Sequence, residues 1–246
     1  MPFLPTNLSQ DLQRELEDFV RNHDFIELYK KYNWRKDTWQ NGFPNILELE
    51  IKITTEAKNN LLKREDILLV ARWGNLRNIQ RVTAPETITL PIFENGYPDN
   101  RIKDDPSYLI RILQENINGL GPTFLSKVLR FALPSEFGAI DTRIVRVFGM
   151  RDPNQQNWLS LRTRNNGYGW YIPENQSAWP KEYSKWINIL RFCAHFLNNS
   201  GILCPHPEGF LTKDLRKRGI WACTDVEMAL FSYASEYLNK KVDDFR

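Results

Sequence analysis

The sequence INGLGPTF, residues 117–124, places two glycines one residue apart between two segments whose apolar residues recur at helical spacing. Pro122 suits the first turn of the second segment, because proline lacks an N–H that would be orphaned there. The bare backbone at Gly119 and Gly121 lets a phosphate approach the free amides and the positive dipole end of the second helix. The stretch predicts two helices joined by a tight hairpin, although such a glycine pair also occurs in ordinary turns.

An acidic residue follows this hairpin. The run FALPSEFGAIDTRIVRV, residues 131–147, ends the second helix near Pro134 and places Asp141 at the start of another helix, 18 positions after Thr123. Arg143 stands directly behind it. An isolated aspartate in this position is most simply a helix N-cap, and the residues alone leave a chemical role open beside that one.

Residues 117–148 resemble the helix-hairpin-helix (HhH-GPD) DNA glycosylases, and the 8-oxoguanine glycosylases among them. That family shares a Leu-Pro-Gly-Val-Gly hairpin, a helix, a loop with glycine or proline, and an acid in a Val-Asp-Thr-His-like context. It keeps the same interval between hairpin helix and acid. The match extends over about 45 residues, from Pro106 to Met150. Hairpin and acid together are specific, whereas the hairpin alone also occurs in ligases, nucleases and recombination proteins.

The resemblance implies that Asp141 stabilises the positive charge that develops on deoxyribose as the N-glycosidic bond breaks, or helps water to attack. The implied reaction is hydrolytic excision of a damaged or modified base in base excision repair, with 8-oxoguanine-like purines favoured. The implied partner is double-stranded DNA that contains such a base. The expected DNA contacts come from Asn118, Gly119, Leu120, Gly121, Thr123 and Arg143.

Lys127 is a second candidate for the chemistry. Members of the family that also cut the strand carry a nucleophilic lysine where this chain has Thr123, which favours a monofunctional enzyme. Lys127 lies four residues further along the same helix face, however, and the run KVLRFA, residues 127–132, is similar to the lysine-containing helix of archaeal-type oxoguanine glycosylases. A bifunctional glycosylase with AP lyase activity is therefore an alternative, and a phosphate-binding or solvated lysine is another.

A flipped base requires an aromatic or apolar pocket. The candidate side chains are those of Trp73, Trp170, Trp221 and Phe231, each of which is also a candidate for plain core. Asp225 joins them, because the final helix of oxoguanine glycosylases helps to hold the base.

The composition excludes several classes of protein. With 246 residues and a net charge of +3, the chain is too weakly basic to be an indiscriminate polyanion binder. It has an odd number of cysteines, no secretory leader and no run of roughly 20 apolar residues, so we expect reduced thiols and no membrane span. We expect a monomer in the cytoplasm, associated with the nucleoid if the source is bacterial.

No cofactor is expected, and the only ion that the resemblance permits is a monovalent cation at the hairpin. Three cysteines cannot supply a four-cysteine iron–sulfur cluster. The set Cys204, His206 and Cys223 lacks the paired short spacings of a zinc site. The resemblance permits a monovalent cation held by backbone carbonyls around residues 118–121.

The expected fold is mainly α, a two-lobed helical glycosylase fold in which DNA crosses the cleft. Residues 101–150 form the hairpin and catalytic region, and residues 1–100 and 151–246 form the flanking helical lobe or lobes. Apolar and charged residues alternate over residues 47–53, which predicts a short extended or β segment. Residues 152–180 are rich in Asn, Gln, Gly and aromatic residues, which predicts an inserted loop region.

Two further functions stay open. The aromatic insert also suits a glycosylase that acts on the bulky modified bases of phage DNA. A non-catalytic helix-hairpin-helix DNA-binding protein would use the hairpin to grip phosphate and Asp141 only to cap a helix.

Overall fold

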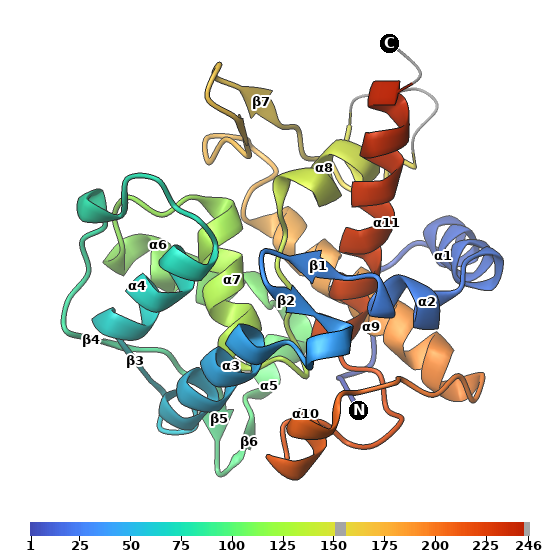
Figure 1. Ribbon diagram of the computed structural model, residues 1–246. Coiled ribbons are helices and arrows are strands. Elements are labelled where there is room, and N and C mark those ends of the chain that lie inside the picture. Colours follow the sequence, from blue (N-terminus) through green and yellow to red (C-terminus); the bar gives the residue numbers. More distant parts are fainter. Residues whose placement is uncertain (151–155, 244–246) are drawn as a thin grey trace.

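The computed structural model describes residues 1–150 and 156–243, which are mainly helical (Figure 1). The helices are α1 (Gln10–Asn22), α2 (Phe25–Lys30), α3 (Pro44–Ala57), α4 (Arg64–Trp73), α5 (Asn100–Asp104), α6 (Ser107–Asn116), α7 (Pro122–Ala132), α8 (Thr142–Phe148), α9 (Lys181–Asn199), α10 (Glu208–Thr212) and α11 (Cys223–Asp243), with 3-10 turns η1 (Trp39–Asn41) and η2 (Ile79–Arg81). Short antiparallel pairs join β1 (Asn33–Trp34) to β2 (Asp37–Thr38), β3 (Leu61–Lys63) to β4 (Thr87–Thr89), β5 (Phe93–Glu94) to β6 (Tyr97–Pro98) and β7 (Arg164–Asn165) to β8 (Trp170–Tyr171). The expected mainly helical class is confirmed.

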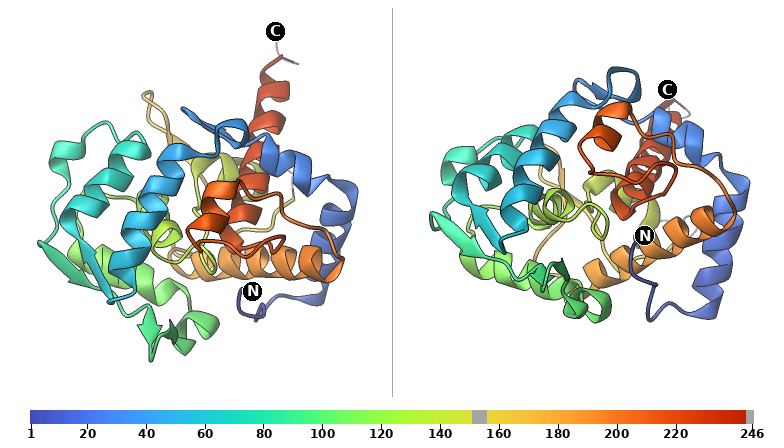
Figure 2. Two further views of the ribbon diagram at one scale, coloured as in Figure 1. Left: turned by 60° about the horizontal axis from the view of Figure 1, so that its bottom comes forward. Right: turned by 90° about the horizontal axis from the view of Figure 1, so that it is seen from below.

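The helices pack in two groups around one continuous apolar core. In one group α11 packs against α2, α8 and α9, and α1 packs against α9. In the other, α7 packs against α3, α4 and α6. Figures 1 and 2 show the two groups on opposite sides of the molecule. The packing thus places α3 and α4 beside the hairpin helices, although the sequence-based division assigned them to a flanking lobe. None of the helices in the described ranges has the length and apolar character of a membrane span.

Residues 47–53 are helical, so the predicted extended segment is wrong. They lie inside α3, whose buried residues follow helical spacing: Ile46, Leu49, Glu50, Ile53 and Ala57. Pro44 opens the helix, and the buried Asp37 carboxylate accepts hydrogen bonds from the amides of Asn45 (2.8 Å) and Ile46 (3.4 Å). The alternation is misleading because Glu50 is buried in an ion pair, which makes a charged residue part of the core face.

The predicted pair of helices and tight turn is confirmed at α6 and α7. Residues 117–121 join them, and Asn118 forms a two-bond antiparallel bridge with Thr83. Gly119 has φ 84°, and a Cβ there would lie 2.7 Å from the carbonyl oxygen of Arg81. The bare Cα of Gly119 therefore allows close packing against the end of η2, which is a different reason from the phosphate approach expected from the sequence.

The predicted insert contains no helix over residues 156–180, and its residues 152–155 lie outside the described ranges. Trp158 anchors its start, since the ring stacks on Phe148 at 4.4 Å between centroids and meets Phe19 edge-on at 5.0 Å. The β7–β8 hairpin projects from the same segment (Figure 1).

Candidate active site

A cleft of about 720 Å³ lies beside the α6–α7 turn, walled by α7, α8, the loop after α4 and the β7–β8 hairpin. Among the described residues, the charged side chains that line it are those of Arg77, Arg81, Lys127, Arg143 and Arg146 and the acid Asp141. A groove with this excess of positive charge attracts polyanions.

Asp141 is the N-cap of α8. Its Oδ1 accepts hydrogen bonds from the backbone amides of Arg143 (2.8 Å) and Ile144 (3.1 Å). Within the described residues no hydrogen bond reaches Oδ2, and the side chain borders the cleft while only 7% of the residue is exposed. One oxygen thus fixes the carboxylate, and the other remains available to a bound molecule.

Beneath the cleft lies a small enclosed chamber with aromatic walls. Its lining is Tyr32, Trp34, Trp73, Lys127, Arg130, Ala139, Asp141, Glu227 and Phe231. The chamber measures about 10 Å³, so no base fits while the aromatic rings keep these positions. Trp34 lies at the boundary, because it lines both chamber and cleft, and its Nε1 donates a hydrogen bond to the carbonyl of Trp73 at 3.0 Å. A base can enter only if a ring such as that of Trp34 moves.

Lys127 projects from α7 into this aromatic enclosure. Its Nζ lies 4.9 Å from the ring centre of Trp34, 5.3 Å from that of Trp73 and 5.4 Å from that of Phe124. No carboxylate of the described residues lies within 4.0 Å of this amine. Burial lowers the pKa of Lys127, and the negative charges of Asp141 and Glu227 oppose that shift. A buried amine with a lowered pKa and no fixed partner is available as a nucleophile.

Glu227 is a chamber residue that the sequence interpretation missed. It projects from α11, and its Oε2 accepts a hydrogen bond from Arg130 Nε at 3.1 Å. Burial raises the pKa of Glu227 to about 7, with Asp141 adding to the shift and Arg130 opposing it. The carboxyl therefore changes charge near neutral pH. The available sequence signal was an acid in an apolar helix, four residues before Phe231 and on the same face.

The structure separates the candidates for the base pocket. Trp73 and Phe231 line the chamber, whereas Trp170 lines the outer cleft. Neither cavity includes Trp221, which is fully buried against Phe25 and Tyr29. Asp225 is absent from both linings as well. Trp221 instead lies in the core, and Asp225 lies in a buried ion-pair network with Arg216 and His206.

Only some of the residues predicted to contact DNA lie in the cleft. Thr123, Gly119 and Arg143 line the cleft, and the Arg143 guanidinium lies over the rings of Trp34 and Phe231 at 5.5 and 4.9 Å. The cleft lining does not include Asn118, Leu120 or Gly121.

A carboxylate stands where the α7 N-terminus was expected to meet a phosphate. A Cβ at Gly121 would lie 3.3 Å from Glu174 Oε1, and burial raises the pKa of Glu174. The carbonyls of Asn118 and Gly121, two of those expected to hold a monovalent cation, already accept backbone hydrogen bonds. A phosphate at this turn would therefore have to displace or neutralise Glu174.

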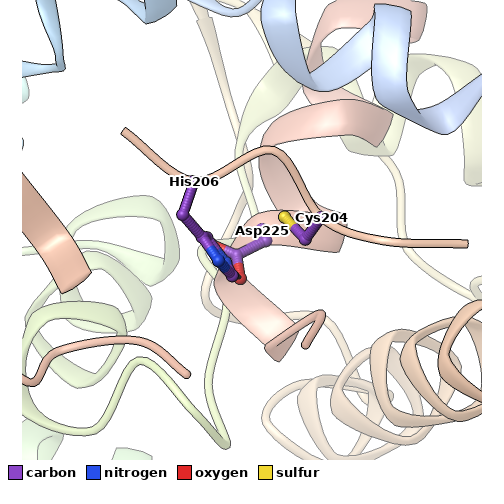
Figure 3. Close-up of side chains that lie close together, drawn as sticks. All are labelled: Cys204, His206 and Asp225. Atoms are coloured by element: carbon purple, nitrogen blue, oxygen red, sulfur yellow. Dashed lines mark hydrogen bonds and ion pairs between the residues drawn. The ribbon is translucent and has the colours of Figure 1, made fainter. Parts of the chain in front are cut away.

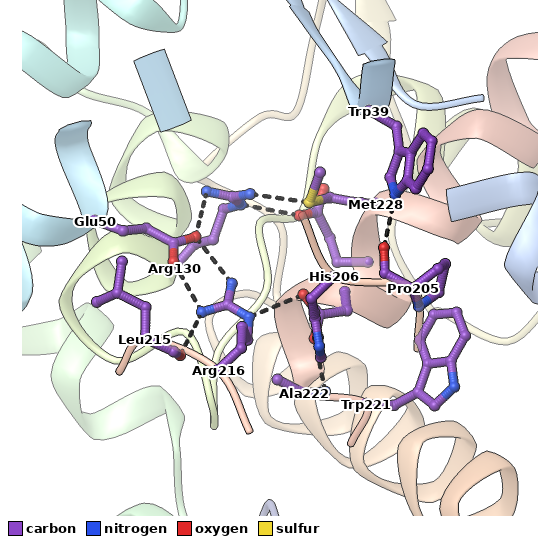
Figure 4. Close-up of polar contacts among 12 residues, drawn as sticks. Trp39, Glu50, Arg130, Pro205, His206, Leu215, Arg216, Trp221, Ala222 and Met228 are labelled. Atoms are coloured by element: carbon purple, nitrogen blue, oxygen red, sulfur yellow. Dashed lines mark hydrogen bonds and ion pairs between the residues drawn. The ribbon is translucent and has the colours of Figure 1, made fainter. Parts of the chain in front are cut away.

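A buried network of charges adjoins the chamber through Arg130, which lines it (Figure 4). Glu50 accepts hydrogen bonds from Arg216 Nη1 at 2.8 Å and Nη2 at 3.0 Å, and it lies 3.6 Å from Arg130 Nη1. Arg216 Nε donates to Asp225 Oδ1 at 3.0 Å. Burial alone would raise the pKa of Asp225, but the Arg216 guanidinium and His206 hold it well below its ordinary value. Through Arg130 this network supports Glu227 in the chamber.

Cys204, His206 and Asp225 bring possible ligand atoms within 4.8 Å of one another (Figure 3). The sequence had raised Cys223 as a partner of the first two, and it is not in this cluster. Oδ2 of Asp225 already contacts His206 Nε2 at 3.0 Å, and Arg216 places a positive charge on Oδ1. Burial also raises the pKa of Cys204, which disfavours the thiolate that a metal needs. The charges favour an ion-pair cluster over a metal site.

Comparisons of the chain with protein-family models, with curated proteins and with solved structures found no match.

Proposed function

We propose that the protein is a DNA glycosylase that excises a damaged or modified base by hydrolysis of the N-glycosidic bond. The observation that carries the proposal is the position of Asp141 and Lys127, which line both the cationic cleft and the aromatic chamber beneath it. A nucleic-acid groove that leads directly to a buried aromatic pocket with a carboxylate at its mouth is the arrangement that base excision requires.

In the proposed mechanism the cations of the cleft hold the DNA backbone. The target base then leaves the base stack, and this unstacking costs a few kcal/mol of free energy. Displacement of Trp34 lets the base enter beside Trp73 and Phe231. The bond between C1′ and the base nitrogen then breaks and its electron pair leaves with the base, which takes a proton from protonated Glu227. Asp141 Oδ2 stabilises the positive sugar and receives a proton from the attacking water.

A bifunctional glycosylase with AP lyase activity is a second candidate, favoured by the lowered pKa of Lys127. In that reaction the neutral amine attacks C1′, displaces the base and forms a Schiff base with the opened sugar. Elimination of the 3′ phosphate then cuts the strand. Asp141 would have the same charge-stabilising role in both reactions.

The proposed substrate is an oxidised purine such as 8-oxoguanine in duplex DNA. The aromatic walls of the chamber offer flat rings against which a purine can stack once a ring such as that of Trp34 has moved. The proposed setting is base excision repair by a monomer in the cytoplasm or, in a bacterium, on the nucleoid.

The test incubates the wild-type protein and its Asp141→Asn and Lys127→Gln variants with end-labelled duplexes that carry 8-oxoguanine or other modified bases. Asparagine is as good an N-cap as aspartate, so this substitution removes the charge while keeping the cap. Wild-type protein should yield abasic sites that break in hot alkali, and Asp141→Asn should bind DNA without making product. Borohydride-trapped adducts that Lys127→Gln loses would select the bifunctional enzyme. Binding without product across the panel would instead favour the non-catalytic DNA-binding module.

A further inference from the structure

The β7–β8 hairpin presents aromatic side chains that the proposed reaction does not use. Tyr168 is 80% exposed and Tyr171 is 41% exposed, and both line the cleft together with Trp170. A single exposed tyrosine is ordinary on a protein surface. Three aromatic residues from one hairpin at the mouth of a cationic cleft form a surface on which a planar ligand can stack.

Hydrogen bonds within the hairpin shape its tip. Asn166 Oδ1 accepts hydrogen bonds from the amides of Tyr168 and Gly169, both at 3.1 Å, and Asn165 Oδ1 accepts one from Gly167 at 2.8 Å. Among the described residues, a Cβ added at Gly167 or Gly169 would meet nothing within 4 Å, so at these two positions the tip stands clear of them. The tyrosines are thus held on a preformed turn and remain accessible.

Positive charge accompanies these rings. The Arg146 guanidinium of α8 lies 4.5 Å from the Trp170 ring centre, and Arg143 lines the same cleft. Cationic grooves with exposed aromatic rings are the recurring design of sites for unpaired nucleic acid, because the groove follows the phosphates while bases stack on the rings. A base inside an intact duplex has both faces covered by its neighbours, so only an unstacked base can meet Tyr168.

We propose that the β7–β8 hairpin is a binding site for an unpaired nucleobase, with Tyr168 and Tyr171 as the stacking residues. The inference rests on the proposed function, since it places DNA in the same cleft. Its consequence is a preference for a target base that lies in a mismatch, a bulge or a single-stranded segment over one in a fully paired duplex.

The test measures dissociation constants by fluorescence anisotropy for one oligonucleotide in three forms: single-stranded, in a duplex with a short central bubble, and fully paired. The variants are Tyr168→Ala, Tyr171→Ala and the double variant. Tyr97→Ala is the matched control, because Tyr97 is 76% exposed and lies outside the cleft lining. Tyr168→Phe keeps the stacking ring without the hydroxyl.

We expect the double variant to lose roughly tenfold or more in affinity for the single-stranded and bubble forms, and less than about twofold for the paired duplex. Tyr168→Phe and Tyr97→Ala should match the wild type. Equal losses for all three forms, or no loss for any, would overturn the stacking site while leaving the glycosylase proposal intact. Failure of the wild-type protein to bind any of the three forms would overturn both.

Discussion

Replacing Glu227 by glutamine tests the buried acid of the chamber through protein stability. Burial raises the pKa of this carboxyl from 4.5 to about 7. The folded protein then binds the proton more tightly than the unfolded chain does. The resulting stabilisation is fully present below the unfolded pKa of about 4.5 and is lost as the pH rises through about 7. The difference corresponds to about 3–4 kcal/mol, since a tenfold change in proton affinity is worth about 1.4 kcal/mol.

The Glu227→Gln variant lacks this titration but keeps an oxygen that can accept the hydrogen bond from Arg130 Nε. Its free energy of unfolding relative to the wild type should therefore rise by about 2–3 kcal/mol between pH 5 and pH 8. For a chain of this size the corresponding shift in relative melting temperature is roughly 4–12 °C. Urea titrations of both proteins at several pH values across this range measure the effect.

Glu15→Gln is the control, because Glu15 is exposed on α1. If the free energies of unfolding of the wild type and Glu227→Gln differ by an amount that stays constant within about 0.5 kcal/mol from pH 5 to pH 8, the near-neutral titration of Glu227 is refuted. Catalysis supplies an independent readout. If Glu227 protonates the departing base, wild-type excision slows as the pH rises above about 7, and the variant is slow throughout that range.

Two other substitutions test the charges around the site. Arg216→Met removes the guanidinium that donates hydrogen bonds to two buried carboxylates, Glu50 and Asp225, so we expect the free energy of unfolding in denaturant to fall by about 3–5 kcal/mol. Arg218→Met, which removes an exposed arginine, should lower the free energy of unfolding by less than about 1 kcal/mol. Equal losses for the two variants would contradict a stabilising role of the buried ion pairs of Arg216. Glu174→Gln removes the carboxylate beside Gly121 and should tighten DNA binding roughly two- to fivefold at low salt, with the gain fading as salt rises. An unchanged affinity at every salt concentration would show that no phosphate approaches the start of α7.

Local signals in the sequence were enough to predict the hairpin and the helix cap. The turn depends on glycines and a proline within a few residues, and the Asp141 cap depends on two amides just ahead of it. The helix over residues 44–57 could not be predicted from such local signals. Its alternating pattern reads as a strand until Glu50 is known to be buried, and its partner Arg216 lies 166 positions away in the chain.

The chamber likewise depends on contacts between residues that lie far apart in the sequence. Asp225 and Glu227 are two residues apart on α11, so their side chains point to different sides of the helix. Asp225 faces Arg216 and His206, whereas Glu227 faces Arg130 and the chamber. The sequence identified the acidic and aromatic segment but not the face that turns towards Asp141, because only the contacts of α11 with α2, α8 and α9 fix its rotation.

The two interpretations of Asp141, helix cap and catalytic carboxylate, do not compete. A catalytic charge acts best when its position is fixed before the substrate binds, since no reorganisation is then needed at the moment of reaction. The two backbone hydrogen bonds to Oδ1 supply that fixation and leave Oδ2 at the cleft. Capping therefore counts neither for nor against catalysis here. Only a substitution that keeps the cap while removing the charge, as Asp141→Asn does, separates an enzyme from a DNA-binding module.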